Sequence, residues 1–192
     1  VLLSGRWFTA PSLDGPWEYL PPDRLAAGFA KIPPDSPSAR VRPSVPGTPE
    51  AREAVAEAQI PQTAAIRPGP APEIKVDYDG EPKFRPIEGT GMEFAVNTAS
   101  SVIREQGRYY LCRDAVWYVA ASPNGPWAVS ASPPREIAKV PPSSPVYNTK
   151  FVTVYEATPE VVYVGYTPGY AGSYVSGGVV VYGTGYPYPG WV

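Results

Sequence analysis

The sequence predicts a mainly β protein, made of tandem antiparallel hairpin and sheet modules with Pro-rich connectors and one short helix. Aromatic and β-branched runs bounded by Asn-Gly, Asp-Gly and Pro turns predict the strands. The 27 Pro and 18 Gly among 192 residues favour many loops. The 14 Tyr, 5 Trp and 5 Phe supply rings for a core. We therefore expect an ordered but loop-rich β protein.

A phrase that occurs twice predicts the modular organisation. RWFTAPSLDGPW at residues 6–17 returns as VWYVAASPNGPW at 116–127, an offset of 110 residues. AKIPPDSP and TPE in the first part return in the same order as AKVPPSSP and TPE. Such a long period is typical of tandem modules that bury surface against their neighbours. We expect a first repeat unit over residues 1–110 and a second, incomplete unit over 111–192.

Local signals predict a hairpin inside each copy of the phrase. Tyr109 to Cys112 and Val116 to Ala121 are aromatic and β-branched runs around a short turn, so they should pair. The Asp-Gly-Pro and Asn-Gly-Pro steps that follow are turn chemistry, as is Asp79-Gly80. The Trp after each Gly-Pro should then fold back onto the strand that carries the earlier Trp. We expect the two Trp of each copy to pack against one another.

The helix is expected at about residues 49–59. Thr48 is the predicted N-cap, Pro49 takes the first helical position and Pro61 stops the alanine-rich run. The same Thr-Pro-Glu at 158–160 is followed by VVYVGY, so a strand is expected there instead. The Pro-rich PPDSP and PPSSP segments are expected to be extended connectors.

Composition excludes several classes of function. A net charge of −2 gives no footprint for nucleic acid, and no apolar run is long enough for membrane insertion. There is no His and one Cys, Cys112, so zinc sites and His-dependent triads lose their usual residues. Asp77, Asp79, Glu81 and Glu88 fit part of a calcium-loop frame, but Pro82 replaces its Gly, which favours a turn with solvated acids. We expect no cofactor, no metal and no enzymatic activity.

The Trp side chains are the candidates for a binding function. Trp7, Trp17, Trp117 and Trp127 have the flat rings on which sugars stack, which would make glycans a partner. Cross-strand aromatic pairs also hold small sheets together, and repetition of the whole phrase favours this structural role.

The quoted phrases, together with SVPGTPEAREAV, YDGEPKFRPIEGT and the tail VVYVGYTPGY, resemble a family of exported, largely uncharacterised proteobacterial repeat proteins. Its members are often labelled carbohydrate-binding, and the similarity covers essentially the whole chain. The sequence is also similar to the subunits of extracellular bacterial fibrils from environmental water. The resemblance implies a secreted protein, extracellular or at the cell surface, and it supplies no catalytic residues.

The two ends of the chain suggest how such a subunit would assemble. Residues 93–110 precede the second hairpin, whereas only five residues, VLLSG, precede the first phrase, so we expect its strand to lack a neighbour. The tail, residues 161–192, carries no charged side chain and is rich in Gly and Tyr. We expect strands from 150–192 of one copy to complete the sheet around residues 1–20 of the next, head to tail, giving a non-covalent homopolymer. The residues expected in this joint are Val1, Leu2, Leu3, Trp7, Phe8, Val179, Val180, Val181 and Tyr182.

Overall fold

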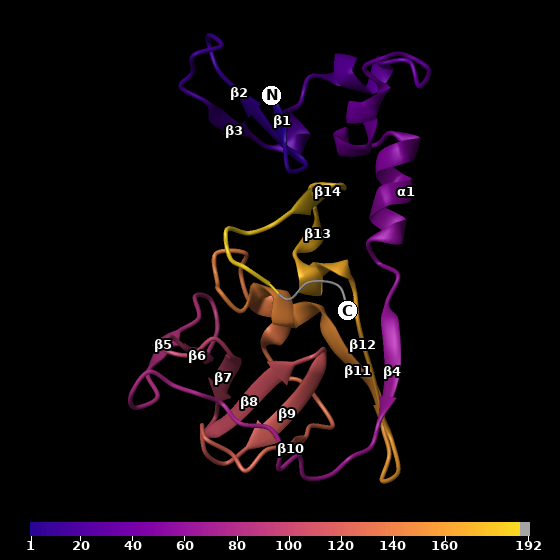
Figure 1. The fold of residues 1–192 in the computed structure, drawn as a ribbon. Helices are drawn as coiled ribbons and strands as arrows, with labels where there is room; N and C mark the ends of the chain where they lie inside the picture. Colours follow the sequence, from indigo (N-terminus) through magenta and orange to yellow (C-terminus); the bar gives the residue numbers. More distant parts are fainter. Residues whose placement is uncertain (189–192) are drawn as a thin grey trace. The chain divides into compact units, whose positions relative to one another are not determined.

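The computed structural model describes residues 1–188, and it confirms a mainly β protein whose sheets are all antiparallel (Figure 1). The chain divides into two compact units. Unit 1 is made from both ends of the chain, Val1–Ile60 and the segment from Ala171 onward, and unit 2 is Pro61–Tyr170. The predicted boundary between repeat units, at residues 110 and 111, lies within strand β8 of unit 2.

Unit 1 contains a small three-stranded sheet, the only α-helix among the described residues, and a hairpin from the far end of the sequence. The sheet has the order β1–β2–β3 and is drawn in indigo in Figure 1. The elements of unit 1 are β1 (Leu2–Leu3), β2 (Arg6–Thr9), β3 (Glu18–Leu20), the 3-10 helices η1 (Pro22–Arg24), η2 (Ala27–Lys31) and η3 (Ala39–Ser44), α1 (Pro49–Glu57), β13 (Ser173–Ser176) and β14 (Val179–Tyr182).

Helix α1 begins where the sequence predicts and ends two residues earlier than expected, at Glu57. The Thr48 hydroxyl accepts a hydrogen bond from the Ala51 N–H at 3.1 Å, which confirms the predicted N-cap. The same hydroxyl lies 2.7 Å from the Arg42 carbonyl oxygen and 3.0 Å from that of Val45. Thr48 therefore joins the start of α1 to the end of η3.

The hairpin β13–β14 forms part of the interior of unit 1. β14 packs on α1 and η3, and Val179, Val180 and Val181 are all buried. The Tyr182 N–H donates to the Ser4 carbonyl oxygen at 3.1 Å, in the turn between β1 and β2. Strand β14 thus packs on the first turn of the same chain.

Unit 2 contains a six-stranded sheet in the order β10–β9–β8–β7–β6–β5 and a three-stranded sheet in the order β11–β12–β4. β8 pairs with β9, which confirms the predicted hairpin. The elements of unit 2 are β4 (Gln62–Ile66), β5 (Phe84–Pro86), β6 (Glu93–Ala95), β7 (Ser101–Glu105), β8 (Arg108–Arg113), β9 (Val116–Ala120), β10 (Ala128–Val129), η4 (Ile137–Lys139), η5 (Tyr147–Phe151), β11 (Val152–Ala157), β12 (Val162–Tyr166) and η6 (Pro168–Ala171).

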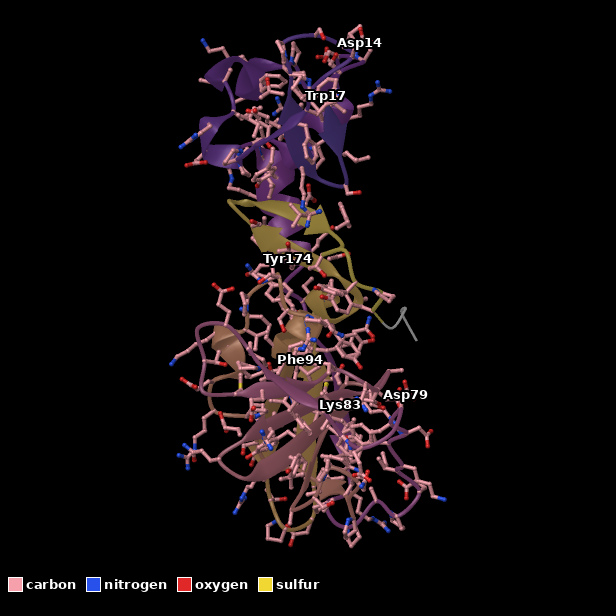
Figure 2. All side chains as sticks on the ribbon, turned by 90° about the vertical axis from the view of Figure 1, so that its left-hand side faces the viewer. Asp14, Trp17, Asp79, Lys83, Phe94 and Tyr174 are labelled. Carbon is pink, nitrogen blue, oxygen red and sulfur yellow. The ribbon has the colours of Figure 1, made fainter. Side chains whose placement is uncertain are left out.

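The turn predicted at Asp79-Gly80 is present, with Gly80 at a φ of +77°. The side chain of Asn97 holds it: its amide donates to the carbonyl oxygens of Asp79 and Glu81 and accepts from the Lys83 N–H. Asp79 and Lys83 are labelled in Figure 2. Asp79 and Glu81 of the calcium-loop frame thus belong to a turn that is fixed by an amide side chain.

The two copies of the repeated phrase form sheets of identical register. β1, β2 and β3 correspond to β8, β9 and β10, and each hairpin turns through two residues of positive φ, Ser4-Gly5 in one and Asp114-Ala115 in the other. Each residue pair of the first sheet has an equivalent pair 110 positions later in the second sheet. The pair Leu2↔Trp7 corresponds to Cys112↔Trp117, Leu3↔Arg6 to Arg113↔Val116, Phe8↔Tyr19 to Tyr118↔Val129, and Thr9↔Glu18 to Val119↔Ala128.

The Pro-rich connectors also match each other, but they are not extended. The Ser36 N–H donates to the Pro33 carbonyl oxygen at 3.2 Å, and the Ser144 N–H donates to that of Pro141 at 3.0 Å. A 3-10 helix follows in each case, η3 and η5. The prediction of extended connectors is wrong, because the residues after each Pro pair close hydrogen-bonded turns to carbonyls three residues back.

Beyond Thr48 and Thr158 the two copies diverge, as the sequence predicts. The alanine-rich residues after Thr48 form α1, while the β-branched and aromatic residues after Thr158 form β12. The structural correspondence therefore covers the hairpins and the connectors, and it does not extend over a complete unit of 110 residues.

Candidate functional site

One face of the sheet β1–β2–β3 carries five large apolar side chains, most of them open to solvent, and Arg6 lies on the same face at the end next to the Ser4-Gly5 turn. Val1 and Phe8 exchange two backbone hydrogen bonds of 2.8 Å, which places their side chains on the same face. Leu3 lies two residues further along the same strand, and Tyr19 is the cross-strand partner of Phe8. We call the set formed by Val1, Leu3, Phe8, Trp17 and Tyr19 the apolar face.

The side chains of the apolar face surround an open depression of about 400 Å³, lined by Val1, Leu3, Phe8 and Trp17. The exposed fractions are 61% for Val1, 63% for Leu3, 41% for Trp17 and 49% for Tyr19. The Phe8 and Tyr19 rings meet edge to face at 6.1 Å. Trp17 is labelled in Figure 2, below Asp14 of the turn that precedes it. This is a contiguous patch of large side chains that water reaches.

The opposite face of the same sheet is buried within unit 1. Trp7 is only 7% exposed, its indole N–H donates to the Ser44 carbonyl oxygen, and its ring packs edge to face on Phe29 at 4.8 Å. Trp7 pairs with Leu20, which is three residues from Trp17, so the two indoles point to opposite faces. The prediction that Trp7 and Trp17 pack against each other is wrong for this reason.

The equivalent face of β8–β9–β10 is covered. Leu111 and Trp127, the counterparts of Val1 and Trp17, are 0% and 1% exposed. They belong to a core cluster with Val76 and Ala120, and Ile74 and Tyr78 pack against it. Val116, Val162 and Val164 form a second cluster with Val129 and Tyr118 at its border, so the sheet β11–β12–β4 covers the rest of this face.

The cover over Trp127 is a segment that pairs with the edge of the sheet; we call residues 69–78 the covering segment. The Val129 N–H donates to the Gly69 carbonyl oxygen, and the Ala71 N–H donates to the Trp127 carbonyl oxygen, both at 2.9 Å. Further along, the Tyr78 hydroxyl donates to the Pro123 carbonyl oxygen at 3.0 Å. Burial raises the pKa of Tyr78 to about 12, with a smaller contribution from Tyr109, so this hydroxyl stays a donor at neutral pH.

The edge of β3 has the same geometry as the edge of β10. Phe8 uses its N–H and carbonyl to bond Val1, so Phe8 and Tyr19 form a non-hydrogen-bonded pair. The N–H and carbonyl of Tyr19 therefore point away from β2, as the N–H of Val129 does in unit 2. Among the described residues, no backbone bond to the Tyr19 N–H or the Trp17 carbonyl corresponds to the bonds made by Gly69 and Ala71.

The predicted sugar-stacking residues have different environments. Trp117 and Trp127 are fully buried, and the Trp117 indole N–H donates to the Val152 carbonyl oxygen at 3.1 Å. Trp7 is buried on the far side of the first sheet. Trp17 is the one member of the predicted set whose ring is open enough in the described structure to receive a ligand.

The prediction that the strand of the first phrase lacks a neighbour is wrong, because β2 pairs with β1 on one side and with β3 on the other. The predicted assembly residues fall into two groups. Val1, Leu3 and Phe8 lie together on the apolar face, while Leu2 is half-buried and Trp7 is buried on the other side. Val179, Val180 and Val181 are buried inside unit 1 and Tyr182 is 54% exposed, so β14 is an interior strand here and not a free one. The remaining tail residues, 189–192, lie outside the described part of the chain.

Two residues with a role in this region, Tyr19 and Arg6, were not predicted from the sequence. Tyr19 belongs to the apolar face, and alternation from Trp17 along the strand would have found it. Arg6 stands where the second sheet has Val116, and its guanidinium donates to the carbonyl oxygens of Tyr182 and Gly183 and to the Tyr174 hydroxyl. Tyr174 is labelled in Figure 2. Nothing in the local sequence around Arg6 points to partners so distant in the chain.

The described residues contain no cluster of three or more His, Cys, Asp or Glu side chains that would hold a metal ion. Cys112 is buried, and burial raises the pKa of its thiol, so it is an interior side chain and not a nucleophile. None of the described helices combines the length and the apolar character that crossing a bilayer requires.

Comparisons of the chain with protein-family models, with curated proteins and with solved structures found no match. The resemblance to exported proteobacterial repeat proteins therefore stays a prediction.

Proposed function

We propose that this protein is a structural subunit that assembles non-covalently with copies of itself, and that the apolar face of β1–β2–β3 is the acceptor surface of the joint. The observation that carries the proposal is the contrast between two sheets of the same register. In unit 2 the equivalent face is buried beneath polypeptide, with Leu111 and Trp127 almost completely inaccessible. In unit 1 the corresponding Val1 and Trp17 stay open.

The chemistry of the depression favours a polypeptide over a sugar. Its lining residues are Val1, Leu3, Phe8 and Trp17, whose side chains offer one polar group, the Trp17 indole N–H. Sugar sites normally combine a ring platform with several converging polar groups. An apolar segment that also pairs with the β3 edge would satisfy both the side chains and the backbone. Because each copy would offer both an acceptor and a donor, the joint would repeat head to tail into a filament.

This role requires no catalytic group, cofactor or nucleic acid. It accords with the resemblance to subunits of extracellular fibrils, and we propose an extracellular or cell-surface location for the assembled protein.

The test places a charge on the apolar face. Leu3→Glu would put a carboxylate in the depression, where a docked segment would have to desolvate it, so assembly should be lost. Ile60→Glu is the matched control, because Ile60 is 64% exposed, as Leu3 is at 63%, and does not belong to the face. Negative-stain microscopy and sedimentation of the purified full chains measure the result. Filaments formed by Leu3→Glu, or a strictly monomeric wild-type chain, would contradict the proposal.

A carbohydrate-binding surface module is the second candidate, favoured by the exposure of Trp17 beside Tyr19. Titration with soluble glucan and chitin oligosaccharides, followed by Trp fluorescence, tests it. Saturable quenching that disappears in Trp17→Ala and persists in Trp127→Phe would favour this second function over the first.

A further inference from the structure

Strand β4 (Gln62–Ile66) is an open edge of the three-stranded sheet of unit 2. It pairs with β12 on one side, and among the described residues no backbone bond reaches its other side. Figure 1 shows β4 beside β12 as the last strand of this sheet. Four of its five residues are exposed, and Ile66 is half-buried. An open edge of this kind offers unpaired N–H and carbonyl groups to another extended chain.

Strand β4 lacks the features that protect the other three sheet edges described in unit 2. The edge of β10 is bonded to the covering segment. β11 has a register shift between Val154 and Glu156, and β5 ends in Arg85 and Pro86. Cover, bulges, charges and Pro are the usual means by which proteins prevent strand addition at an edge. β4 has the sequence QTAAI and an uninterrupted five-residue register with β12, so it has none of these protections.

The pairing of β12 with β11 shows which backbone groups of β12 point toward β4. The Thr167 N–H donates to the Phe151 carbonyl oxygen at 3.2 Å, one step before the pair Val152↔Tyr166. Hydrogen-bonded and non-hydrogen-bonded pairs alternate along an antiparallel ladder, so Tyr166 makes no backbone bond to β11. The N–H and carbonyl of Tyr166 therefore point toward β4, and those of Val164, two residues earlier, do the same.

The outward groups of β4 follow from this direction. Gln62 and Ala64 are the partners of those two β12 residues, so they use their N–H and carbonyl groups inside the sheet. Thr63 and Ala65 alternate with them, and their N–H and carbonyl groups point away from β12. The open edge thus presents two donors and two acceptors.

These groups are complementary to those of an identical strand. When a second copy approaches in antiparallel orientation, with a two-fold axis at Ala64, each Thr63 lies opposite the Ala65 of the other strand. Each of these pairs exchanges two hydrogen bonds, which satisfies every outward N–H and carbonyl of both strands. The closely spaced pair at the axis consists of two Ala64 side chains, which are small. Arg67 of one strand lies beside Pro61 of the other, so the two charges stay apart.

We propose that β4 is an interaction surface for β4 of a second copy of this chain, and that two three-stranded sheets join there into one antiparallel sheet. An identical strand is the occupant because a single register pairs all outward groups and leaves none over. This contact does not use the apolar face, so it goes beyond the proposed head-to-tail joint. Between two head-to-tail polymers it would repeat along their length, which strengthens a contact that is weak in a single pair.

The test uses the Leu3→Glu chain, whose apolar face is blocked, so that pairing through β4 stops at a dimer. Sedimentation equilibrium should show a reversible equilibrium between monomer and dimer. Further substitution by Ala64→Lys or by Ala64→Glu places like charges opposite each other at the axis, and the dissociation constant should rise about fivefold or more. A mixture of the Ala64→Lys and Ala64→Glu chains should form one-to-one dimers again, because the charges then attract.

Two substitutions at residue 63 separate backbone pairing from side-chain effects. Thr63→Pro removes an N–H that points outward, so the protein's own sheet keeps its bonds, while the dimer loses two hydrogen bonds. Its dissociation constant should rise about tenfold or more. Thr63→Val keeps the N–H and should dimerise like its parent. Thermal melts check that both variants are folded.

The outcomes distinguish this contact from the proposed function. A Leu3→Glu chain that is monomeric at every concentration would overturn the β4 contact and leave the edge to a strand of a different protein. A mixture of the Ala64→Lys and Ala64→Glu chains that dimerises no better than either alone would overturn it as well. Neither result affects the head-to-tail joint, which is contradicted only by filaments of Leu3→Glu or by a strictly monomeric wild type.

Discussion

The sheets β1–β2–β3 and β8–β9–β10 have the same strand register, the same two-residue turn of positive φ and the same Gly-Pro-Trp step, yet one is almost wholly interior and the other is half surface. Their buried faces are alike, since Trp7 and Trp117 both donate their indole N–H to a backbone carbonyl. Their other faces differ in whether other segments of the chain cover them. A repeated sequence thus fixes a local backbone, while the segments around it decide whether an aromatic side chain is core or surface.

Substitution of the paired Trp residues should show the largest difference between the sheets. Trp127→Ala should destabilise the protein by about 3–5 kcal/mol, because the ring is fully buried in the core of unit 2. Trp17→Ala removes a ring that is 41% exposed and should cost clearly less. Denaturant unfolding of both variants measures this. Equal losses would mean that Trp17 is covered in solution, and the contrast between the sheets would disappear.

The turns of the two hairpins allow the next test. Gly5→Ala gives the first turn the residue of the second, but a Cβ there would lie 2.3 Å from the Val180 carbonyl oxygen. We expect a loss of about 1–3 kcal/mol from the clash, in addition to backbone strain. Gly107→Ala is the control, because Gly107 has a similar φ of +77° and open space around it. If thermal melts show equal effects, β14 does not pack on the first turn as described.

The capping threonines should show a smaller difference. Thr48→Ala removes the acceptor for Ala51 and the contacts with η3, and it should cost about 1 kcal/mol. Thr158→Ala, at the equivalent position, affects only a surface turn in which the hydroxyl accepts from the Glu160 and Val161 N–H groups. Chemical denaturation of the two variants should rank Thr48→Ala as the more destabilising. The reverse order would contradict the view that Thr48 ties two elements together.

The smallest expected effect is the contribution of Glu50 to the pH dependence of protein stability. The hydrogen bond from the Arg42 guanidinium, 2.8 Å long, is the largest cause that lowers the pKa of this carboxyl. A carboxyl with a lowered pKa in the folded state stabilises the fold above its unfolded pKa, about 4.3, and loses this contribution as the pH falls through the folded value. Wild type should therefore lose slightly more stability than Glu50→Gln on acidification below about pH 4.3. Parallel pH profiles of the melting temperature would contradict this.

Much of the fold could be predicted because its signals are local. Alternating aromatic and β-branched residues indicated β8 and β9, and Thr48-Pro49 indicated the start of α1. The same Thr-Pro-Glu precedes β12, and the residues that follow it were enough to predict a strand. In these places the propensity of a few neighbouring residues decides the structure.

The site was predicted only in part, because burial depends on distant partners. Strand propensity marked Val179, Val180 and Val181, but it does not reveal that α1 and η3 cover β14. Likewise, Trp17 and Trp127 have almost the same neighbours in sequence, and only the covering segment separates an exposed ring from a buried one. The Pro-rich connectors misled for a different reason, since their serines close turns that an extended Pro segment would not form.

The origin of unit 1 from both ends of the chain has a consequence for biosynthesis. Every strand of unit 2 has been synthesised once translation reaches Tyr166, so this unit can complete its sheets while the tail is still being made. Synthesis of unit 1 begins first, but this unit can complete its fold only after Val179 to Tyr182 have been made, because that strand packs on its helices and on its first turn. A chain cut short before Val179 would consequently lack the strand that packs on α1, on η3 and on the Ser4-Gly5 turn, so its unit 1 would stay unfinished while its unit 2 could already be complete.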